Sequence, residues 1–230
     1  MPYHIKAERV PEGVLITGDP LRADRFASLL ERPRLINDNR GLRTYVGFYK
    51  DKEVAIAAHG MGGPSVAIVV EELISIGAKR IIRVGTAGAI SPELRPGDVL
   101  VADAASSTYG GAGLGLYFGS ICPPSSPDLE LTYRLLQELS KLGVKATKGA
   151  VFSSDSFYAE SNVLGLLKSL GFKAVEMECA TVTALSRIRG VSAACALVIS
   201  NSAGSLQSDQ ALVDKGLMSA AAASLEVLIR

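Results

Sequence analysis

Short apolar runs alternate with amphipathic segments along almost the whole of this 230-residue chain, and this alternation constrains its fold more than any other feature. The apolar runs have the length of strands and lie at residues 14–17, 44–49, 54–58, 81–84, 98–102, 149–152, 174–177 and 194–199. The segments with helical periodicity lie at residues 21–30, 65–76, 128–142, 162–170, 178–189 and 210–228. The pattern predicts a single-domain α/β protein over residues 1–230, with helices on both faces of a mixed, mostly parallel central sheet in a three-layer α/β/α arrangement.

Three connecting segments carry further predictions. Residues 45–58 are expected to form a hairpin that turns at Asp51 and Lys52. Two polar, glycine-containing stretches, at residues 106–127 and 202–209, are predicted as loops. Each follows a predicted strand, so each either covers a ligand site or is a plain surface loop.

The composition argues against several classes of partner. The formal net charge is +1 and tryptophan is absent, so neither a basic surface nor a stacking platform for nucleic acid is evident. The first residues lack the apolar core of a signal peptide, and no uncharged apolar stretch approaches the length of a membrane span. Three cysteines without CxxC spacing fit a reducing compartment, so the expected location is the cytoplasm, away from any membrane.

One arginine is placed inside an apolar strand. Residues 81–90 read IIRVGTAGAI, with Arg83 near the end of the predicted strand and a glycine-rich turn expected directly after it. An unpaired charge in a buried strand is costly, so Arg83 requires an anion, which is either an internal carboxylate or a bound ligand. The small residues after it would let backbone N–H groups approach that anion closely.

A second glycine and arginine follow another strand. Gly18 and Arg22 come directly after the strand predicted at residues 14–17, and α/β folds bind ligands at the carboxyl ends of their strands. Taken singly, either arginine is best explained by a structural ion pair. Two arginines at two such positions favour a small polyanion site, for which phosphate is the simplest candidate.

Two carboxylates stand where a predicted strand meets a predicted helix. Glu176 and Glu178 flank Met177 at this junction, and one carboxylate is expected to stabilise the N-terminus of the helix. The other is then available to a polar ligand such as a ribose, whose paired hydroxyls a carboxylate can accept. Phe157, in a polar turn after another predicted strand, is a candidate for contact with a sugar or base.

The chain has two histidines, His4 and His59. His4 lies near the N-terminus and by itself reads as a solvent-exposed residue, whereas His59 ends a predicted strand and is expected either in the core or at the mouth of a site. The sequence shows no Ser-His-Asp order, no cluster with metal-ligand spacing and no P-loop of the Walker type. A metal site is therefore not expected.

Together these segments resemble the nucleoside phosphorylase family that includes hexameric purine nucleoside phosphorylases and uridine phosphorylases. The resemblance covers nearly the whole chain in the family's order, through the motifs GDPLR at 18–22, NDNRG at 37–41, GMGGPS at 60–65, RVGTAG at 83–88, SSDSFY at 153–158 and EME at 176–178. Each motif alone is a weak signal, whereas the ordered set is specific.

The resemblance implies a role for each matching position. The implied phosphate contacts within the chain's own site are Gly18, Arg22, Arg83 and Thr86. The implied ribose contacts are Met61, Met177 and Glu178, of which Glu178 accepts the 2′ and 3′ hydroxyls. Phe157 is the aromatic residue beside base and sugar. His4 and Arg40 match residues that serve a neighbouring subunit, at its ribose 5′-hydroxyl and its phosphate, so the resemblance implies a homo-oligomer, in the family a hexamer built as a trimer of dimers.

The base end of the site separates the members of this family. Many purine members have an aspartate there that protonates purine N7, whereas this chain has Ser200 and Asn201. An amide donates hydrogen bonds but is no general acid at neutral pH, so Asn201 favours 6-oxopurines, in which negative charge moves toward O6. The Gln and Arg with which uridine phosphorylases read uracil are missing after Phe157, although GGPS at 62–65 and Thr86 resemble the uridine group.

The resemblance thus implies a purine nucleoside phosphorylase that prefers inosine and guanosine and releases free base and ribose 1-phosphate. Arg22, Arg83 and Asn201 are expected to act in catalysis, and Phe157, Ser200 and Asn201 to bind the base. Inorganic phosphate is a co-substrate, and no cofactor is implied. The alternative is a uridine phosphorylase; nucleoside hydrolysis, which would leave both arginines without an anion, and non-catalytic nucleoside binding are more distant.

Overall fold

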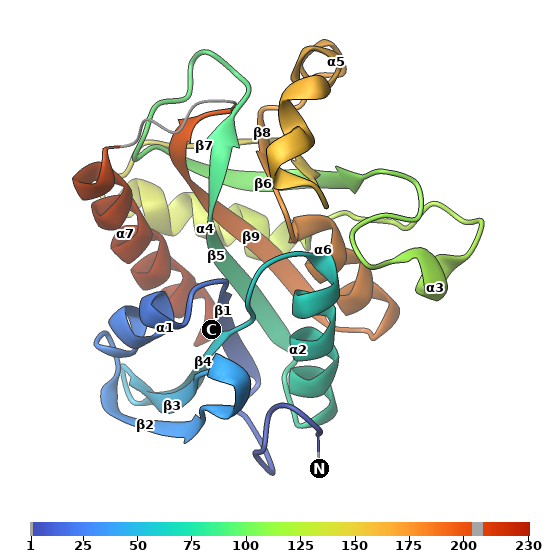
Figure 1. Ribbon diagram of the computed structural model, residues 1–230. Helices are drawn as coiled ribbons and strands as arrows, with labels where there is room; N and C mark the ends of the chain where they lie inside the picture. The colour runs from blue at the N-terminus through green and yellow to red at the C-terminus, as the bar shows by residue number, and fades with distance from the viewer. Residues whose placement is uncertain (1, 204–208) are drawn as a thin grey trace.

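The computed structural model describes residues 2–203 and 209–230, which form a nine-stranded mixed sheet with helices on both faces (Figure 1). The strands are β1 (Gly13–Thr17), β2 (Glu31–Asn37), β3 (Thr44–Tyr49), β4 (Lys52–Ala58), β5 (Arg80–Ala89), β6 (Val99–Ser107), β7 (Ala146–Ser153), β8 (Ala174–Glu176) and β9 (Ser192–Ser202). The helices are α1 (Pro20–Ala27), α2 (Gly63–Ser75), α3 (Gly115–Phe118), α4 (Leu129–Lys141), α5 (Leu164–Ser169), α6 (Cys179–Ile188) and α7 (Gln210–Leu228), with 3-10 turns η1 (Asn39–Gly41) and η2 (Phe157–Asn162). The predicted α/β class with a mixed sheet is confirmed.

The sheet has the order β2-β3-β4-β1-β5-β8-β7-β6-β9, and β9 pairs additionally with β5. This last pairing closes β5, β8, β7, β6 and β9 into a ring, while β4, β3 and β2 extend the sheet beyond β1. β1 runs parallel to both β4 and β5, so these three strands point toward the same edge. Segments that follow them in sequence are thereby brought together in space.

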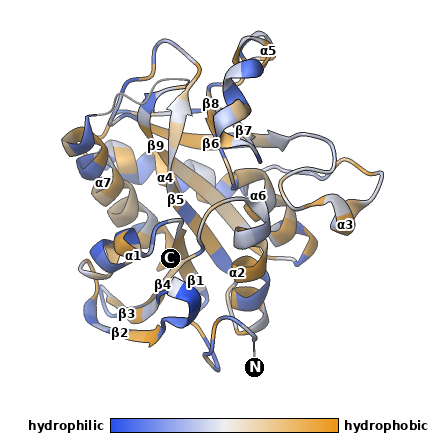
Figure 2. Ribbon diagram, viewed as in Figure 1, coloured by the Kyte–Doolittle hydropathy of each residue, from blue (hydrophilic) through white to orange (hydrophobic). Residues whose placement is uncertain are grey.

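The core lies in two layers, one on each face of the sheet. Alternate residues of β1 divide between the layers, with Val14 and Ile16 packed on one side and Leu15 on the other. Helices α2 and α6 cover the first face, and α1, α4 and α7 cover the second (Figure 1). Figure 2 shows that the central strands are mainly apolar, which fits strands buried on both faces.

Two strands differ from the sequence predictions. β2 was not predicted, because its sequence ERPRLIN is polar and its residues from Glu31 to Leu35 are exposed, as suits an edge strand. β5 continues to Ala89, so the glycine-rich turn predicted after Arg83 is wrong. Parallel pairing with β9 holds β5 extended over this stretch. Gly85 makes room for the Arg83 side chain, since a Cβ there would lie 2.8 Å from the guanidinium.

The predicted loops and hairpin are changed in detail. β3 and β4 form the expected hairpin, but Tyr49 pairs with Lys52, so the turn residues are Lys50 and Asp51, at φ 48° and 62°. The stretch predicted as a loop at 106–127 begins inside β6 and contains the short helix α3. Of the loop predicted at 202–209, residues 204–208 lie outside the described residues. No helix among those described combines the length and the apolar character needed to cross a bilayer.

Candidate active site

The register of the sheet gathers three segments at one edge. Ile16 of β1 pairs with Arg83 of β5, and Thr17 pairs with Ala58, the last residue of β4. Arg83 therefore lies level with the end of β1, where Gly18 begins the GDPLR segment. His59 follows β4 at the same edge, and its backbone N–H donates to the carbonyl of Thr17 (2.8 Å).

Arg83 is buried between two carboxylates. Its side chain is 4% exposed, its Nη1 lies 3.1 Å from Oε2 of Glu176, and its Nη2 donates to Oε2 of Glu178. Burial acts to lower the pKa of Arg83, but Glu178, with Cys179 and Glu176, raises it above its ordinary value. Of the two anions that the sequence allowed for this arginine, the structure therefore shows the internal carboxylate.

Glu176 stabilises the start of α6, as the sequence predicted for one carboxylate of the pair. Its Oε2 accepts the backbone N–H groups of Glu178 (2.8 Å) and Cys179 (3.0 Å). The hydroxyl of Ser153 donates to its Oε1 (2.5 Å) and accepts from the N–H of Ala180 (2.9 Å). The Glu176 side chain is fully buried, so its orientation is fixed from β7, β8 and α6 together.

Glu178 is the more adaptable of the two carboxylates. Its Oε1 accepts the N–H of Gly62 at the start of α2 (2.7 Å), which joins the N-terminal ends of α2 and α6. Burial raises its pKa; Arg83 acts to lower it and Glu176 to raise it, and the net direction is upward. Met177 precedes Glu178 in sequence and is partly buried, whereas Met61 precedes Gly62, whose N–H this carboxylate accepts, and is 83% exposed.

The proposed phosphate residues approach the sheet edge from different elements. Arg22 lies on α1, where its Nη1 is 3.5 Å from the hydroxyl of Thr17. Burial lowers the pKa of Arg22, Asp19 opposes this and the nearby Arg83 adds to it, so two cations share this region. Gly18 packs closely against the neighbouring segment, because a Cβ there would lie 3.0 Å from the carbonyl oxygen of Gly60.

Thr86 is placed less directly. It lies on β5 three residues beyond Arg83, partly buried and paired with Val198 of β9. Side chains alternate along a strand, so Thr86 projects from the face opposite to Arg83. Strand geometry alone therefore does not bring Thr86 and Arg83 to one ligand.

Two of the base-binding candidates, Ser200 and Asn201, lie where the pairing of β9 with β5 becomes irregular. The register with β5 shifts between Ala87 and Gly88, which makes Ser200 the bulged residue, and a bulge re-aims the side chains around it. The hydroxyl of Ser200 donates to Oδ1 of Asn201, and Nδ2 of Asn201 donates to the carbonyl of Ser202 (3.1 Å). Phe157, on η2, is about half exposed and packs edge-on against Tyr158, with ring centroids 5.3 Å apart.

His4 and Arg40 lie together, away from Arg83. Nδ1 of His4 donates to Oε1 of Glu72 (2.9 Å), and Nδ2 of Asn39 donates to the carbonyl of His4 (3.0 Å), which brings Arg40 to the same corner. Glu72 is near the C-terminal end of α2, whereas Gly62 and Glu178 meet at its other end, roughly 14 Å away for a rise of 1.5 Å per residue. The structure does not bring these two residues to the chain's own site.

Several contributors were not predicted as site residues. Asp155 accepts the N–H of Ala112 (2.7 Å), and Thr181 donates to the carbonyl of Ala112 (2.5 Å), so the segment before α3 is held against the SSDSFY motif. A Cβ on Gly63 would lie 2.2 Å from the same carbonyl, so the segment also touches the start of α2. Ser153 and Asp155 belong to a motif that the sequence singled out, but their partners are distant in sequence.

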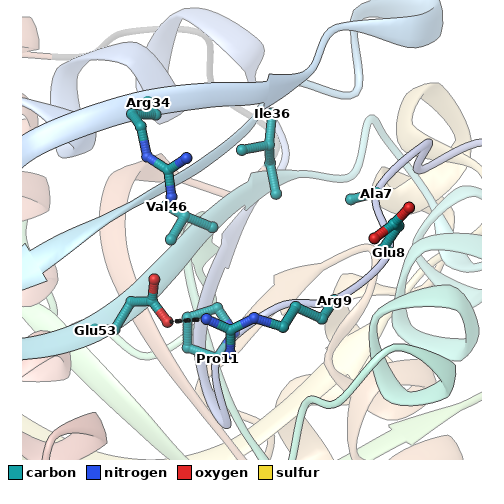
Figure 3. A pocket seen from close by; sticks show the side chains of 8 residues that line it. All are labelled: Ala7, Glu8, Arg9, Pro11, Arg34, Ile36, Val46 and Glu53. Atoms are coloured by element: carbon teal, nitrogen blue, oxygen red, sulfur yellow. Dashed lines mark hydrogen bonds and ion pairs between the residues drawn. The ribbon is translucent and has the colours of Figure 1, made fainter.

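A separate cavity of about 270 Å³ lies between the N-terminal segment and strands β2, β3 and β4, and none of the site residues described above lines it (Figure 3). It is lined by Ala7, Glu8, Arg9, Pro11, Arg34, Ile36, Val46 and Glu53. The ion pair between Arg9 and Glu53, at 3.0 Å, lies across it. In the described part of the chain, no three His, Cys, Asp or Glu residues are grouped so that they could hold a metal ion.

Comparison with known proteins shows which proteins the chain is similar to. The chain is 36% identical over 215 residues to a uridine phosphorylase of Thermococcus kodakarensis, covering 86% of this chain and 76% of the relative. It is 37% identical over 206 residues to a purine nucleoside phosphorylase DeoD-type of an Exiguobacterium species, covering 87% and 86%. The crystal structure of uridine phosphorylase from Vibrio fischeri superposes with a TM-score of 0.91 at 31% identity, covering 98% of this chain and 95% of the other.

Fold and relatives together define an α/β enzyme of the nucleoside phosphorylase type. The family model described as the phosphorylase superfamily matches residues 13–230, and the chain belongs to that superfamily.

Proposed function

We propose that the chain catalyses the phosphorolysis of purine nucleosides, with a preference for the 6-oxopurine nucleosides inosine and guanosine. The observation that supports it is the contact between Arg83 and Glu178 at the edge of the sheet. It joins a guanidinium, which suits phosphate, to a carboxylate, which suits the paired hydroxyls of ribose. The two substrates of the reaction therefore have recognition groups side by side.

In the proposed reaction, phosphate is held by the guanidinium groups of Arg22 and Arg83 and by backbone donors near Gly18. One phosphate oxygen forms a bond to C1′ of the ribose as the bond from C1′ to the base nitrogen breaks, and the electron pair leaves with the base. The sugar passes through an oxocarbenium-like state, which the adjacent phosphate dianion stabilises. The products are ribose 1-phosphate and free base. Phosphate supplies the nucleophile, so the proposal requires no metal or organic cofactor.

The preference for a 6-oxopurine rests on Asn201 at the end of β9. The hydroxyl of Ser200 donates to Oδ1 of Asn201, which directs the amide NH₂ of that residue the other way. An NH₂ group can donate to O6 or N7 of a departing hypoxanthine or guanine, but it cannot readily protonate N7 of adenine.

Uridine phosphorolysis is the second candidate. It is favoured by the T. kodakarensis relative, which is named a uridine phosphorylase, and by the GGPS segment at 62–65 with Thr86. The residues after Phe157 and Tyr158 are Ala159 and Glu160, and they provide no donor pair for the uracil edge. Base contacts decide specificity, so we rank the purine assignment first.

Phosphorolysis of inosine, guanosine, adenosine, methylthioadenosine and uridine, each with and without phosphate, tests the proposal. We expect strict dependence on phosphate and a higher kcat/KM for inosine and guanosine than for adenosine. Asn201→Asp should narrow the gap to adenosine if the new carboxyl is desolvated enough to hold a proton near neutral pH. A wild-type preference for uridine would replace the purine assignment, and turnover without phosphate would replace phosphorolysis by hydrolysis.

We also propose a homo-oligomer, by resemblance a hexamer formed as a trimer of dimers, in which His4 and Arg40 complete the site of a neighbouring subunit. His4 contacts Glu72 near one end of α2, whereas Glu178, the partner of Arg83, contacts Gly62 at the other end, and this separation supports the proposal. Asn39 donates to the carbonyl of His4, so Arg40 lies at the same end as His4. A cytoplasmic role in nucleoside catabolism and purine salvage fits the same proposal.

Mixing two inactive variants tests the shared site. Arg40→Ala removes a residue of the neighbouring subunit's site, whereas Arg83→Ala removes a residue of the subunit's own site. A mixed pair therefore has one complete site and one that lacks both arginines. After joint dissociation and reassembly at equal amounts, we expect roughly a quarter of wild-type activity, because half of the pairs are mixed and half of their sites are complete. Activity no greater than the sum of the two separate variants would show that Arg40 serves its own subunit.

A further inference from the structure

His59 is held at the centre of the phosphate region by its backbone. Its N–H donates to the carbonyl of Thr17 (2.8 Å), and its own carbonyl accepts the hydroxyl of Ser65 (2.6 Å). Its ring packs against Gly18, since a Cβ built on that glycine would lie 3.6 Å from Cε1 of the imidazole. The ring therefore lies next to Gly18, whose backbone we propose as a phosphate donor.

Both ring nitrogens of His59 are buried, and neither has a hydrogen-bond partner among the described residues. The residue is 0% exposed, so its ring is out of contact with bulk solvent. A buried polar group without a partner is unusual in a folded protein, and each one carries a desolvation cost. Nε of Arg83 is likewise buried without a partner. Unpartnered nitrogens on two side chains in one region favour a ligand that offers several acceptors.

The charges around His59 define what it can donate. Burial lowers the pKa of His59 well below its ordinary value, and the guanidinium groups of Arg83 and Arg22 lower it further, while the nearby backbone of Gly60 and of His59 itself opposes the shift without reaching hydrogen-bond geometry. A neutral imidazole carries one N–H, which donates a hydrogen bond without adding a third cation to the site. Phosphate, with oxygens that accept from several directions, matches one imidazole N–H and two guanidinium groups.

We propose that His59 is a further phosphate-binding residue, whose neutral imidazole donates its N–H to an oxygen of the phosphate held by Arg22 and Arg83. The ring is flanked by Gly18 and by Gly60, which has φ 75°, so the adjoining backbone carries no side chains. A small shift of these glycines is then enough to bring a ring nitrogen to the ligand. This inference rests on the proposed phosphorolysis, because it assigns a donor to the same phosphate.

Two substitutions separate the donor from the packing of the ring. His59→Leu fills a similar volume and removes the N–H, whereas His59→Gln keeps an N–H donor on a flexible chain. For His59→Leu we expect the KM for phosphate to rise by about tenfold to 100-fold, the range for a lost hydrogen bond to a charged acceptor. The KM for the nucleoside should stay within about threefold of wild type, because the lost contact is to phosphate. His59→Gln should recover much of the phosphate affinity.

Thermal unfolding without substrates provides the structural readout. His59→Leu should not lower the Tm, because an apolar side chain replaces two buried nitrogens that have no partner. The rise of Tm on adding inorganic phosphate should be smaller in this variant than in wild type. Thr132→Val is the matched control, since the hydroxyl of Thr132 on α4 is also buried without a partner but lies outside the site. It should leave the KM for phosphate unchanged.

Three results would overturn the assignment. The first is a wild-type KM for phosphate in His59→Leu. The second is an equal rise of both KM values together with a lower Tm, which marks a core residue. The third is failure of His59→Gln to bind phosphate better than His59→Leu. All three are distinguishable from failure of the proposed function, which would appear as turnover of the wild-type enzyme that does not depend on phosphate.

Discussion

Arg83→Ala is expected to lower kcat/KM for phosphate by at least about 100-fold, the effect of removing a preorganised donor from developing charge in a buried site. The guanidinium is 4% exposed and is fixed by Glu176 and Glu178 before any ligand binds. It therefore contributes to phosphate binding without first being ordered. Steady-state kinetics with phosphate varied at saturating nucleoside would measure the loss.

The same substitution also leaves two buried carboxylates without their cation, so part of the loss could come from unfolding. Removing one partner of a buried ion pair costs about 3–5 kcal/mol. Arg22→Ala separates the two effects, because the guanidinium of Arg22 forms no ion pair with any described residue and has a long contact of 3.5 Å with the hydroxyl of Thr17. It should raise the KM for phosphate with little change in Tm.

Arg25→Ala is the control on the same helix. Arg25 forms a half-exposed ion pair with Asp214 (2.9 Å), and such surface pairs contribute about 0–1 kcal/mol. It should leave phosphate kinetics near wild type. If Arg83→Ala and Arg22→Ala folded and showed wild-type phosphate kinetics, both arginines would be structural and the phosphate site would lie elsewhere.

Much of the scaffold could be predicted from periodicity alone. β3 and α7 have the predicted bounds, because alternation in a half-buried strand and an apolar stripe on a long helix are local signals. The extension of β5 to Ala89 could not be predicted, because glycine and alanine report no strand preference. Parallel pairing with β9, more than 100 residues later in the chain, decides it.

The candidate site, like the fold, could be predicted from the sequence only in part. The need of Arg83 for an anion follows from a charge in an apolar strand, and the helix-stabilising carboxylate follows from its position before α6. Glu176 and Glu178 together pair with Arg83 and stabilise the start of α6. This double role depends on the register between β1, β5 and β8, which the sequence does not specify. The unpartnered ring of His59 likewise follows only from tertiary packing, since the sequence left it between the core and the mouth of the site.

Glu176→Gln and Glu178→Gln should have opposite consequences, although the two residues are one position apart. Glu176 accepts two backbone N–H groups and the Ser153 hydroxyl and is fully buried. An amide turns an NH₂ toward those donors and removes the charge facing Arg83, so we expect a loss of about 3–5 kcal/mol in the free energy of unfolding. Urea unfolding at neutral pH measures it.

Glu178→Gln should instead retain or gain stability while losing nucleoside affinity. The pKa of Glu178 is raised by burial, and Glu176 adds to the rise, so its ionised form is less favourable in the folded than in the unfolded protein. Ionisation of Glu178 therefore lowers the free energy of unfolding as the pH rises above the pKa that this residue has in the unfolded chain. The stability advantage of Glu178→Gln over wild type should accordingly shrink on acidification.

The two variants are also expected to differ in catalytic activity. An amide accepts only through one oxygen and cannot bind two ribose hydroxyls as a carboxylate does, so Glu178→Gln should lower kcat/KM for the nucleoside by about 100-fold while the KM for phosphate changes less. With the stability expected above, and checked by urea unfolding of the same variant, that loss is not attributable to unfolding. If Glu176→Gln lost nucleoside binding and Glu178→Gln lost stability, the ribose and helix-stabilising roles would have to be exchanged between the two carboxylates.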